Sequence, residues 1–316
     1  MITRRGFFKV LGGSLAGVVS LGGYAFAYEP LARLAITHYQ LTPPGWTPGL
    51  KLRVVALADL HACEPWMSAS RIAAICHKAN ELEGDVTVLL GDYAAGMNMV
   101  TQYVHSRQWS KALATLQAPL GVHAIMGNHD WWEDRTAQKN GGMETFGHRA
   151  LADVGIPVYG NRAVRLEKDG RGFWLAGLED QLALLPGRKW GRTQMLGLDD
   201  LEGTMAQVTD DAPVILLAHE PDIFPRVPER VSLTLSGHTH GGQIRLLGRS
   251  PIVPSRYGNR YAYGHMIEEG RNIIVSGGLG CSIAPVRFGV PPEIVVIDLG
   301  KEWHDQAHSH PPECGR

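Results

Sequence analysis

Charge of one sign is what this chain most clearly lacks. Its 316 residues contain 30 Lys and Arg against 31 Asp and Glu, so the formal net charge is −1. Bulk electrostatics therefore imply no polyanion partner such as DNA, and no nucleic acid is expected. The sequence also contains no internal repeat and no long charge run. With 44% hydrophobic and 19% charged residues, it has an ordinary globular composition and is long enough for one large domain or two.

Two catalytic signatures are also missing. The sequence shows no Ser-His-Asp arrangement and no Gly-Lys-Ser loop of the kind that cradles phosphates. Cysteine is scarce, with four residues that allow three complete disulfide pairings, and the sequence does not choose among them. Histidine and glycine, in contrast, are plentiful, at 14 and 38 residues. Histidine side chains are therefore the first candidates for catalytic or metal-binding groups.

The N-terminus differs from the rest of the chain. Arg4 and Arg5 open it, and a glycine-studded apolar stretch ends at Ala25–Ala27 with an A-x-A sequence. This order is typical of a secretory signal, and the paired arginines resemble a twin-arginine export signal. An uncleaved anchor is the alternative, because the stretch is near the length of a membrane span. Both interpretations place the domain outside the cytoplasm, in the periplasm or cell envelope, with the export machinery and the membrane surface as partners.

The remaining chain divides into three parts. Residues 28–50 are polar and Pro-rich and are expected to be a linker, after the signal or anchor at 1–27. Residues 51–300 form the main domain, in which buried-strand patterns such as "LRVVALAD", "DVTVLLGD" and "GVHAIMGN" alternate with helical stretches. This alternation predicts an α/β domain with much parallel pairing. Residues 301–316 are a polar, His-rich tail that we expect to be disordered.

Polar clusters follow five of the expected strands, at the point where each strand ends. In open α/β sheets, ligands gather beyond the carboxyl ends of the strands, so these side chains are expected to meet at one place. Carboxylate, carboxamide and imidazole groups suit divalent manganese, iron or zinc. The clusters are Asp59 with His61, Asp92, Asn128 with His129 and Asp130, His219, and His238 with His240.

Taken in order, these clusters resemble the calcineurin-like metallophosphoesterase family, whose pattern is D-x-H, G-D, G-N-H-D/E, H and G-H-x-H. The resemblance spans roughly residues 52–299, and "GHTHGGQI" is most similar to a twin-arginine-exported bacterial subgroup. It implies an α/β/β/α sandwich of four layers with two mixed sheets. It also implies two divalent ions, with manganese preferred and iron or zinc as alternatives. One ion would be held by Asp59, His61, Asp92 and His240, and the other by Asp92, Asn128, His219 and His238.

The same resemblance assigns roles near the phosphate. His129 would aid the leaving group, and Asp130 would orient His129. Arg287 and Arg245 are candidates for binding phosphate oxygens, with a surface role as the alternative. Trp131 and Trp132 would wall a substrate groove or pack their loop. One departure is Ala95, where many relatives carry an acidic residue.

The expected activity is hydrolysis of a phosphodiester or pyrophosphate by a hydroxide shared between the two ions. The subgroup suggests UDP-2,3-diacylglucosamine or another lipid-linked phosphate as the substrate. The alternatives are a broad-specificity phosphomonoesterase and an inactive interaction scaffold on the same fold. The segment "QLALLPGRKW" is interpreted as core packing or as a lipid-facing edge. Cys63 and Cys281 are expected at the rim of the site, near each other and as free thiols.

Overall fold

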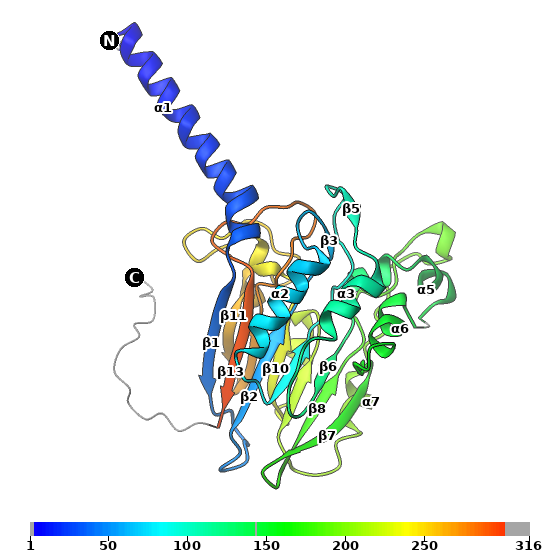
Figure 1. Ribbon diagram of the computed structural model, residues 1–316. Helices are drawn as coiled ribbons and strands as arrows, with labels where there is room; N and C mark the ends of the chain where they lie inside the picture. The colour runs from blue at the N-terminus through cyan, green and yellow to red at the C-terminus, as the bar shows by residue number, and fades with distance from the viewer. Residues whose placement is uncertain (1–2, 143, 301–316) are drawn as a thin grey trace.

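The computed structural model describes residues 3–142 and 144–300. Two mixed sheets form the centre of the domain (Figure 1), with strand orders β1-β13-β2-β4-β6 and β11-β12-β10-β9-β8-β7. The first sheet contains β1 (Ala35–Leu41), β2 (Leu52–Leu57), β4 (Val86–Leu89), β6 (Val122–Ala124) and β13 (Glu293–Leu299). The second contains β7 (Arg162–Lys168), β8 (Arg171–Gly177), β9 (Val214–Leu217), β10 (Val231–Ser236), β11 (Gly264–Glu268) and β12 (Arg271–Val275).

The apolar run of β2 shows why the sheets bury both faces. Alternate residues of a strand point to opposite faces. Leu52, Val54 and Ala56 accordingly pack between the two sheets, against side chains from β8, β9 and β10. Val55 and Leu57 point the other way, into the layer under the helices. A continuous apolar run is therefore what this position in the fold requires.

Helices cover the outer faces of both sheets. On the first sheet, the outer core contains side chains of α2 (Ala69–Asn80), α3 (Ser106–Leu113) and α6 (Phe146–Ala152). On the second, it contains α7 (Leu201–Met205) and the short 3₁₀ turns η3 (Pro221–Arg226) and η5 (Gly258–Tyr261). The expected four-layer α/β/β/α architecture is confirmed. Ser68 caps α2 by accepting the N–H of Arg71.

The N-terminal region departs from the expectation of a linker. Helix α1 (Arg4–Gly23) continues into η1 (Tyr24–Ala32), a segment of π-helix, and the chain then enters β1. β1 pairs in parallel with β13 along its whole length. Residues 28–50 therefore include an edge strand of the first sheet, which the sequence pattern missed. Among the described residues, no helix combines the length and hydropathy needed to cross a bilayer.

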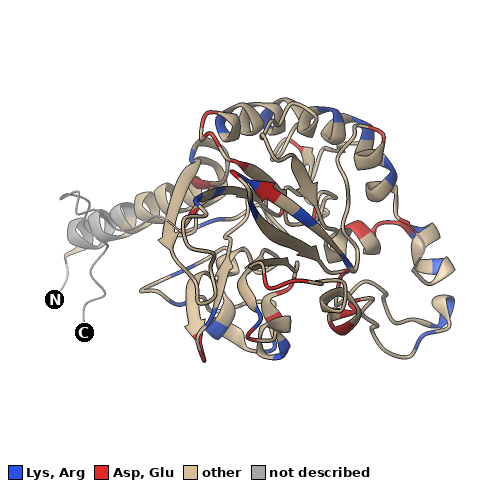
Figure 2. Ribbon diagram, turned by 90° about the horizontal axis from the view of Figure 1, so that it is seen from below, with Lys and Arg blue, Asp and Glu red and all other residues tan. Residues whose placement is uncertain are grey.

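Parallel pairing brings the polar strand ends together. β2, β4 and β6 run parallel, and so do β8, β9, β10 and β12. The short elements beyond these ends include β3 (Cys63–Glu64), β5 (Gln102–Tyr103), α4 (Asn128–Trp132) and η4 (His240–Gly242). Two further short helices, α5 (Arg135–Asn140) and η2 (Arg188–Trp190), lie in longer loops. Acidic and basic residues are interspersed over the ribbon (Figure 2), in keeping with the balanced net charge.

The core between the sheets gives a test of this packing. Phe173 on β8 is fully buried there. Phe173→Ala should lower the free energy of unfolding by about 3–5 kcal/mol, because it removes apolar contacts and leaves a cavity. Ile267→Ala, at an exposed apolar position on β11, is the control and should change stability by less than about 0.5 kcal/mol. Urea unfolding measures both, and equal effects would contradict the assignment of the core.

Candidate metal centre and active site

The expected ligand residues lie on strained turns that directly follow strands. Asp59 and His61 come after β2, Asp92 after β4, and His238 and His240 after β10, and all five have positive φ angles, between 48° and 67°. Non-glycine residues seldom adopt this conformation. Such strain concentrates at functional sites, where the surrounding fold holds it in place. The turns aim side chains from both sheets at one point.

Glycines next to these turns provide the space. A Cβ atom on Gly127 would collide with the Asp92 carboxylate and with the ring of His219. A Cβ on Gly237 would lie 2.7 Å from Asp59 Oδ2. The glycines of the "GNHD" and "GHTH" sequences are therefore required by close approach between loops.

The structure brings all seven expected ligand residues together. The ligand atoms of Asp59, His61 and His240 lie within 4.8 Å of one another, and so do those of Asp92, His219 and His238. Asp92 lies between the two groups, with Oδ2 3.5 Å from His61 Nε2 and 3.3 Å from His219 Nε2. Asn128 joins the second group, since its Oδ1 lies 2.8 Å from His238 Nδ1.

Backbone carbonyls orient the imidazole rings. Nδ1 of His61 lies 2.8 Å from the carbonyl oxygen of Ala94, and Nδ1 of His219 lies 2.7 Å from that of Leu90. His238 uses its other nitrogen, with Nε2 2.9 Å from the carbonyl oxygen of Pro254. The remaining nitrogen of His61 and of His219 faces the Asp92 carboxylate, and that of His238 faces the Asn128 carboxamide. Metal-binding histidines typically use their second nitrogen in this way.

The charge state of the centre matches a cation site. Burial lowers the pKa of His61 to about 3, and burial together with His61 lowers the pKa of His240 well below its usual value, so both rings are neutral. Burial raises the pKa of Asp59 to about 7. Within the described part of the chain, the buried Asp59 Oδ2 and His219 Nε2 have no hydrogen-bond partner. Divalent cations would satisfy these atoms and offset the cost of burying the carboxylates.

His129 lies beside the centre, on α4. Its backbone N–H donates to Asp92 Oδ1 at 2.8 Å, and its ring packs edge-on against that of His61. Nε2 lies 3.4 Å from the hydroxyl of Ser282, and Nδ1 lies 4.0 Å from Glu133 Oε1. Asp130, which is expected to orient this ring, directs its carboxylate to backbone N–H groups in the structure. Glu133, which the sequence interpretation missed, is the carboxylate that faces the ring.

Asp130 instead holds two loops together. Its fully buried carboxylate accepts the backbone N–H groups of Asp92, Tyr93, Ala94 and Gly127, at 2.9–3.0 Å. Burial, with the neighbouring charge of Asp92, raises the pKa of Asp130 to about 7, although these hydrogen bonds lower it. Asp130 therefore fixes the turn that carries Asp92 relative to the one that carries Asn128.

The expected substrate residues are placed differently from one another. Arg287 is fully buried, and its guanidinium donates to the carbonyl oxygens of Gly277, Gly280 and Val290 and faces His240 Nδ1 at 3.2 Å. It thus positions a ligand loop and does not face substrate. Trp131 is also buried, in the core under the helices.

The other two candidates lie nearer the surface. Trp132 borders the pocket described below, whereas Arg245 is half-buried and lies over the ring of Tyr263. In the segment "QLALLPGRKW", Ala183 and Leu184 pack in the core, as one of the two interpretations expected.

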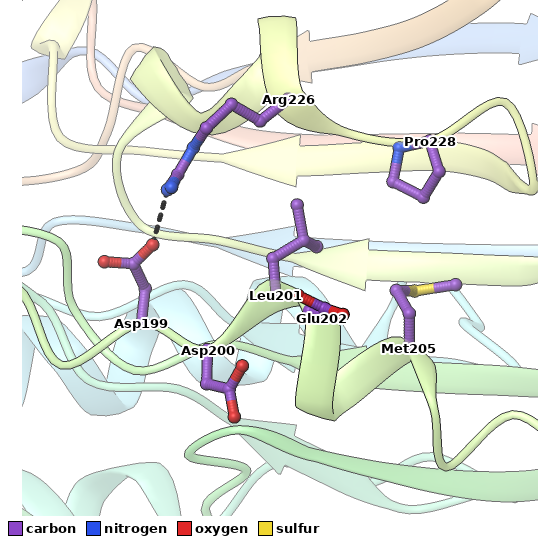
Figure 3. A pocket seen from close by; sticks show the side chains of 7 residues that line it. All are labelled: Asp199, Asp200, Leu201, Glu202, Met205, Arg226 and Pro228. Carbon is purple, nitrogen blue, oxygen red and sulfur yellow. Dashed lines mark hydrogen bonds and ion pairs between the residues drawn. The ribbon is translucent and has the colours of Figure 1, made fainter.

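A pocket of about 370 Å³ opens directly onto the centre. Asp92, Asn128, His238 and His240 form its polar side, next to His129. Its other walls are mostly apolar and come from Trp132, Ile244, Ile252, Pro254, Ile283, Ala284 and Val286. A separate pocket of about 500 Å³ lies between α7 and η3, where Asp199 pairs with Arg226 (Figure 3). That larger pocket contains none of the expected ligands, so the smaller one is the candidate active site.

Two buried carboxyl groups lie behind the centre. Asp180 and Glu220 form a further cluster with His219, and burial together with Glu220 raises the pKa of Asp180 well above its usual value. Burial lowers the pKa of His219, but the carboxylates of Asp92, Glu220 and Asp59 raise it by more. This excess of negative charge again favours a cation. The position of Glu220 directly after His219 was a signal that the sequence offered.

Cys63 and Cys281 are buried, unpaired and packed in one small cluster, and Cys76 is also free. The expectation of neighbouring free thiols is confirmed. Cys314 and the His-rich tail at 301–316 lie outside the described residues.

Comparison with known proteins decides the family. A model of the calcineurin-like phosphoesterase family matches residues 52–242. The chain belongs to this family. Its members use divalent metals, and the two clusters of imidazoles and carboxylates are candidates to hold them here. Membership supports activity as a phosphoesterase hydrolase.

The relatives cover nearly the whole chain. This phosphoesterase is 33% identical over 308 residues to the uncharacterized metallophosphoesterase YkuE of Bacillus subtilis, covering 94% of this chain and 98% of that protein. It is 28% identical over 308 residues to the phosphodiesterase YaeI of Escherichia coli, covering 95% and 100%. Among solved structures, it is similar to the NAD nucleotidase NadN of Haemophilus influenzae, with 14% identity, a TM-score of 0.44 and coverage of 77% and 50%.

The position of Asp92 predicts its effect on metal content. Asp92→Asn should lower the number of bound ions by at least one per chain, because a neutral amide bridges two cations poorly. Elemental analysis after loading with Mn²⁺ measures this. Asp210→Asn, which changes a carboxylate bound to Trp174 and Arg165 away from the centre, is the control. Full metal content in Asp92→Asn would contradict the shared role.

Asp130 gives a stability test. In Asp130→Asn, the amide NH₂ would face backbone donors, so the free energy of unfolding should fall by about 1–3 kcal/mol. Exposed Asp153→Asn should have little effect. Urea unfolding of metal-free protein checks both. Unchanged stability together with a shifted pH–rate profile would show that Asp130 acts on His129 after all.

Proposed function

We propose that this protein is an exported phosphodiesterase that uses two divalent ions, with manganese preferred and iron or zinc as alternatives. It would cleave a phosphodiester or pyrophosphate whose leaving group carries a bulky apolar part. The observation that carries the proposal is the pocket, in which the metal-ligand cluster forms one side and apolar residues form the others. The name of the related phosphodiesterase of Escherichia coli supports the choice of bond.

The proposed division of labour follows from the geometry. When bound, two divalent ions supply positive charge to the phosphate oxygens and lower the pKa of a water. Asp92 lies between the two ligand groups and would hold both ions. Asp59, His61 and His240 would complete one site, and Asn128, His219 and His238 the other. Asp130 and Arg287 keep the ligand loops in place through the hydrogen bonds described above.

His129 is proposed to act on the leaving group. Its ring lines the pocket, and Nε2 lies on the side of Ser282. As water adds to phosphorus and the ester bond breaks, the departing oxygen needs a proton. His129 would donate it from Nε2, and Glu133 near Nδ1 would orient the ring. Each turnover then converts a diester and water into a monoester and an alcohol.

The apolar walls support an amphiphilic substrate. Trp132, Ile244 and Ile252 would contact an aryl or lipid group, which gains about 25 cal/mol per Å² of apolar area removed from water. UDP-2,3-diacylglucosamine and other lipid-linked phosphates of the cell envelope are the candidates. The basic and apolar N-terminus supports export by the twin-arginine route and contact with a membrane surface.

Hydrolysis of bis-p-nitrophenyl phosphate tests this function. Purified protein loaded with Mn²⁺ should hydrolyse it, and His129→Gln should slow turnover about 10²–10⁴-fold, the usual contribution of general acid catalysis. The metal content should not change. His38→Gln, which changes an exposed side chain on β1, is the control and should not change turnover.

Other outcomes would identify the alternatives. Complete inactivity of the metal-loaded protein would indicate an interaction scaffold. Preference for a small phosphomonoester would indicate a broad phosphomonoesterase. Loss of metal from His129→Gln would make His129 a ligand.

A further inference from the structure

Two loops that line the pocket, and a third that is bridged to one of them, expose large apolar side chains. These loops span residues 94–101, 243–254 and 281–290. Leu247 and Ile283 are the most exposed of these side chains, at 105% and 80% of their full areas. We call the following five residues the apolar rim: Met99, Leu246, Leu247, Ile252 and Ile283. Large apolar side chains that gather on exposed, linked loops are typical of an interaction site.

The three loops are tied to one another. Gly96 forms a bridge with Ser282, and Ile244 forms one with Phe288. The Gln243 side chain accepts the Ser282 N–H at 2.6 Å and donates to the Ala284 carbonyl oxygen at 3.1 Å. The rim is therefore a built surface with a fixed shape next to the pocket mouth.

Backbone conformation holds two of the rim residues outward. Leu247 and Ile283 have φ angles of 49° and 65°. This conformation is unfavourable for bulky and β-branched residues. The fold thus accepts strain and apolar exposure at the same positions, which is the pattern of functional surfaces.

The charge of the loops indicates which kind of surface they contact. Residues 94–101, 243–254 and 281–290 contain Arg245, Arg249 and Arg287 but no Asp or Glu. Arg287 is buried, whereas Arg249 is exposed beside the rim. A symmetric contact between two copies would bring these like charges together, which disfavours it. Basic and apolar side chains in one surface instead match the headgroup region of an anionic bilayer.

The N-terminal helix leaves the domain beside the same loops. The Arg287 N–H donates to the carbonyl oxygen of Ala25 in η1 at 2.9 Å, and the ring of Phe288 packs edge-on against that of Tyr24. Beyond η1, Leu15, Val18 and Val19 of α1 are exposed. Figure 1 shows α1 projecting from the end of the domain that carries the yellow and orange loops. Apolar residues from distant parts of the sequence therefore collect at one end.

We infer that the apolar rim docks on an anionic lipid bilayer and turns the pocket mouth toward it. A lipid-linked phosphate would then reach the centre while its acyl part stays in the bilayer or along the apolar pocket wall. The substrate part of this inference rests on the proposed function. The docking itself depends only on the rim.

Labelling tests the docking directly. Leu247→Cys and, as a control, Ile267→Cys on β11 are prepared in a Cys314→Ser background of the full chain, because the three described cysteines are buried. Each variant carries an environment-sensitive fluorophore. Vesicles of phosphatidylglycerol and phosphatidylcholine should shift the emission at 247 to the blue, and brominated lipids should quench it. The label at 267 should remain unaffected.

A second variant measures the contribution of the rim to binding. Leu246→Asp with Leu247→Asp should lower the partition coefficient onto these vesicles about tenfold or more. Hydrolysis of soluble bis-p-nitrophenyl phosphate should not change, because neither residue lines the pocket.

The outcomes separate the two proposals. An unshifted label at 247, or unchanged partitioning of the double variant, would overturn the docking. So would a lipid-free dimer that the double variant dissociates, since the rim would then be an interface between copies. If the label at 247 enters the bilayer but the protein has no phosphodiesterase activity, the docking stands and only the proposed function is refuted.

Discussion

Two buried carboxylates, Asp59 and Asp92, lie where the carboxyl ends of strands from both sheets meet, and they face imidazole rings. Negative charge without water is costly unless it is paired. The left-handed turns, the glycines that clear space and the carbonyls that orient each ring all bring these groups closer together. Folding therefore assembles a concentration of charge that divalent cations relieve. Burying these carboxylates lowers the stability of the metal-free protein, and metal binding would raise it again.

Hydrogen bonds from residues behind the candidate ligands hold this centre in place. Asp130 gathers backbone N–H groups from two turns, and Arg287 gathers carbonyl oxygens around the loop beside His240. Both side chains are fully buried, and both are held mainly by backbone partners. Asp130 joins the two turns of the first sheet that carry Asp92 and Asn128. The Asp59 carboxylate accepts the backbone N–H of His238 and so links the two sheets. A site shared between two sheets needs such connections, because no single strand fixes it.

The positions of the candidate ligands could be predicted from the sequence because each depends on local information. A polar residue directly after a buried strand lies at the sheet edge whatever the rest of the chain does. The role of Asp130 could not be predicted by adjacency, since neighbours in a helix do not face each other, whereas residues four apart do. Helical spacing in "HDWWE" would have favoured Glu133 as the partner of His129.

Tertiary burial explains the other differences. Arg287 and Trp131 have the chemistry of substrate residues, but their exposure depends on packing that the sequence pattern does not reveal. β1 was missed because prolines flank a short strand whose partner, β13, lies at the other end of the chain. The apolar rim was missed because apolar residues in a sequence are expected in the core, and the pattern does not show that these are exposed.

The place of Gln243 has a consequence for how such a protein can diversify. Gln243 lies three residues after His240, and its side chain is bound to the backbone of the neighbouring loop at Ser282 and Ala284. It thus marks a boundary between the segment that holds metal ligands and the segment that carries Leu246, Leu247 and Ile252. Replacement of residues 246–249 would alter what approaches the pocket, whereas Ser250, whose hydroxyl donates to the Gly241 carbonyl oxygen beside His240, belongs with the ligand turn. The groups that meet a substrate at the tip of this loop can therefore change while the turn at His238 and His240 keeps its backbone contacts.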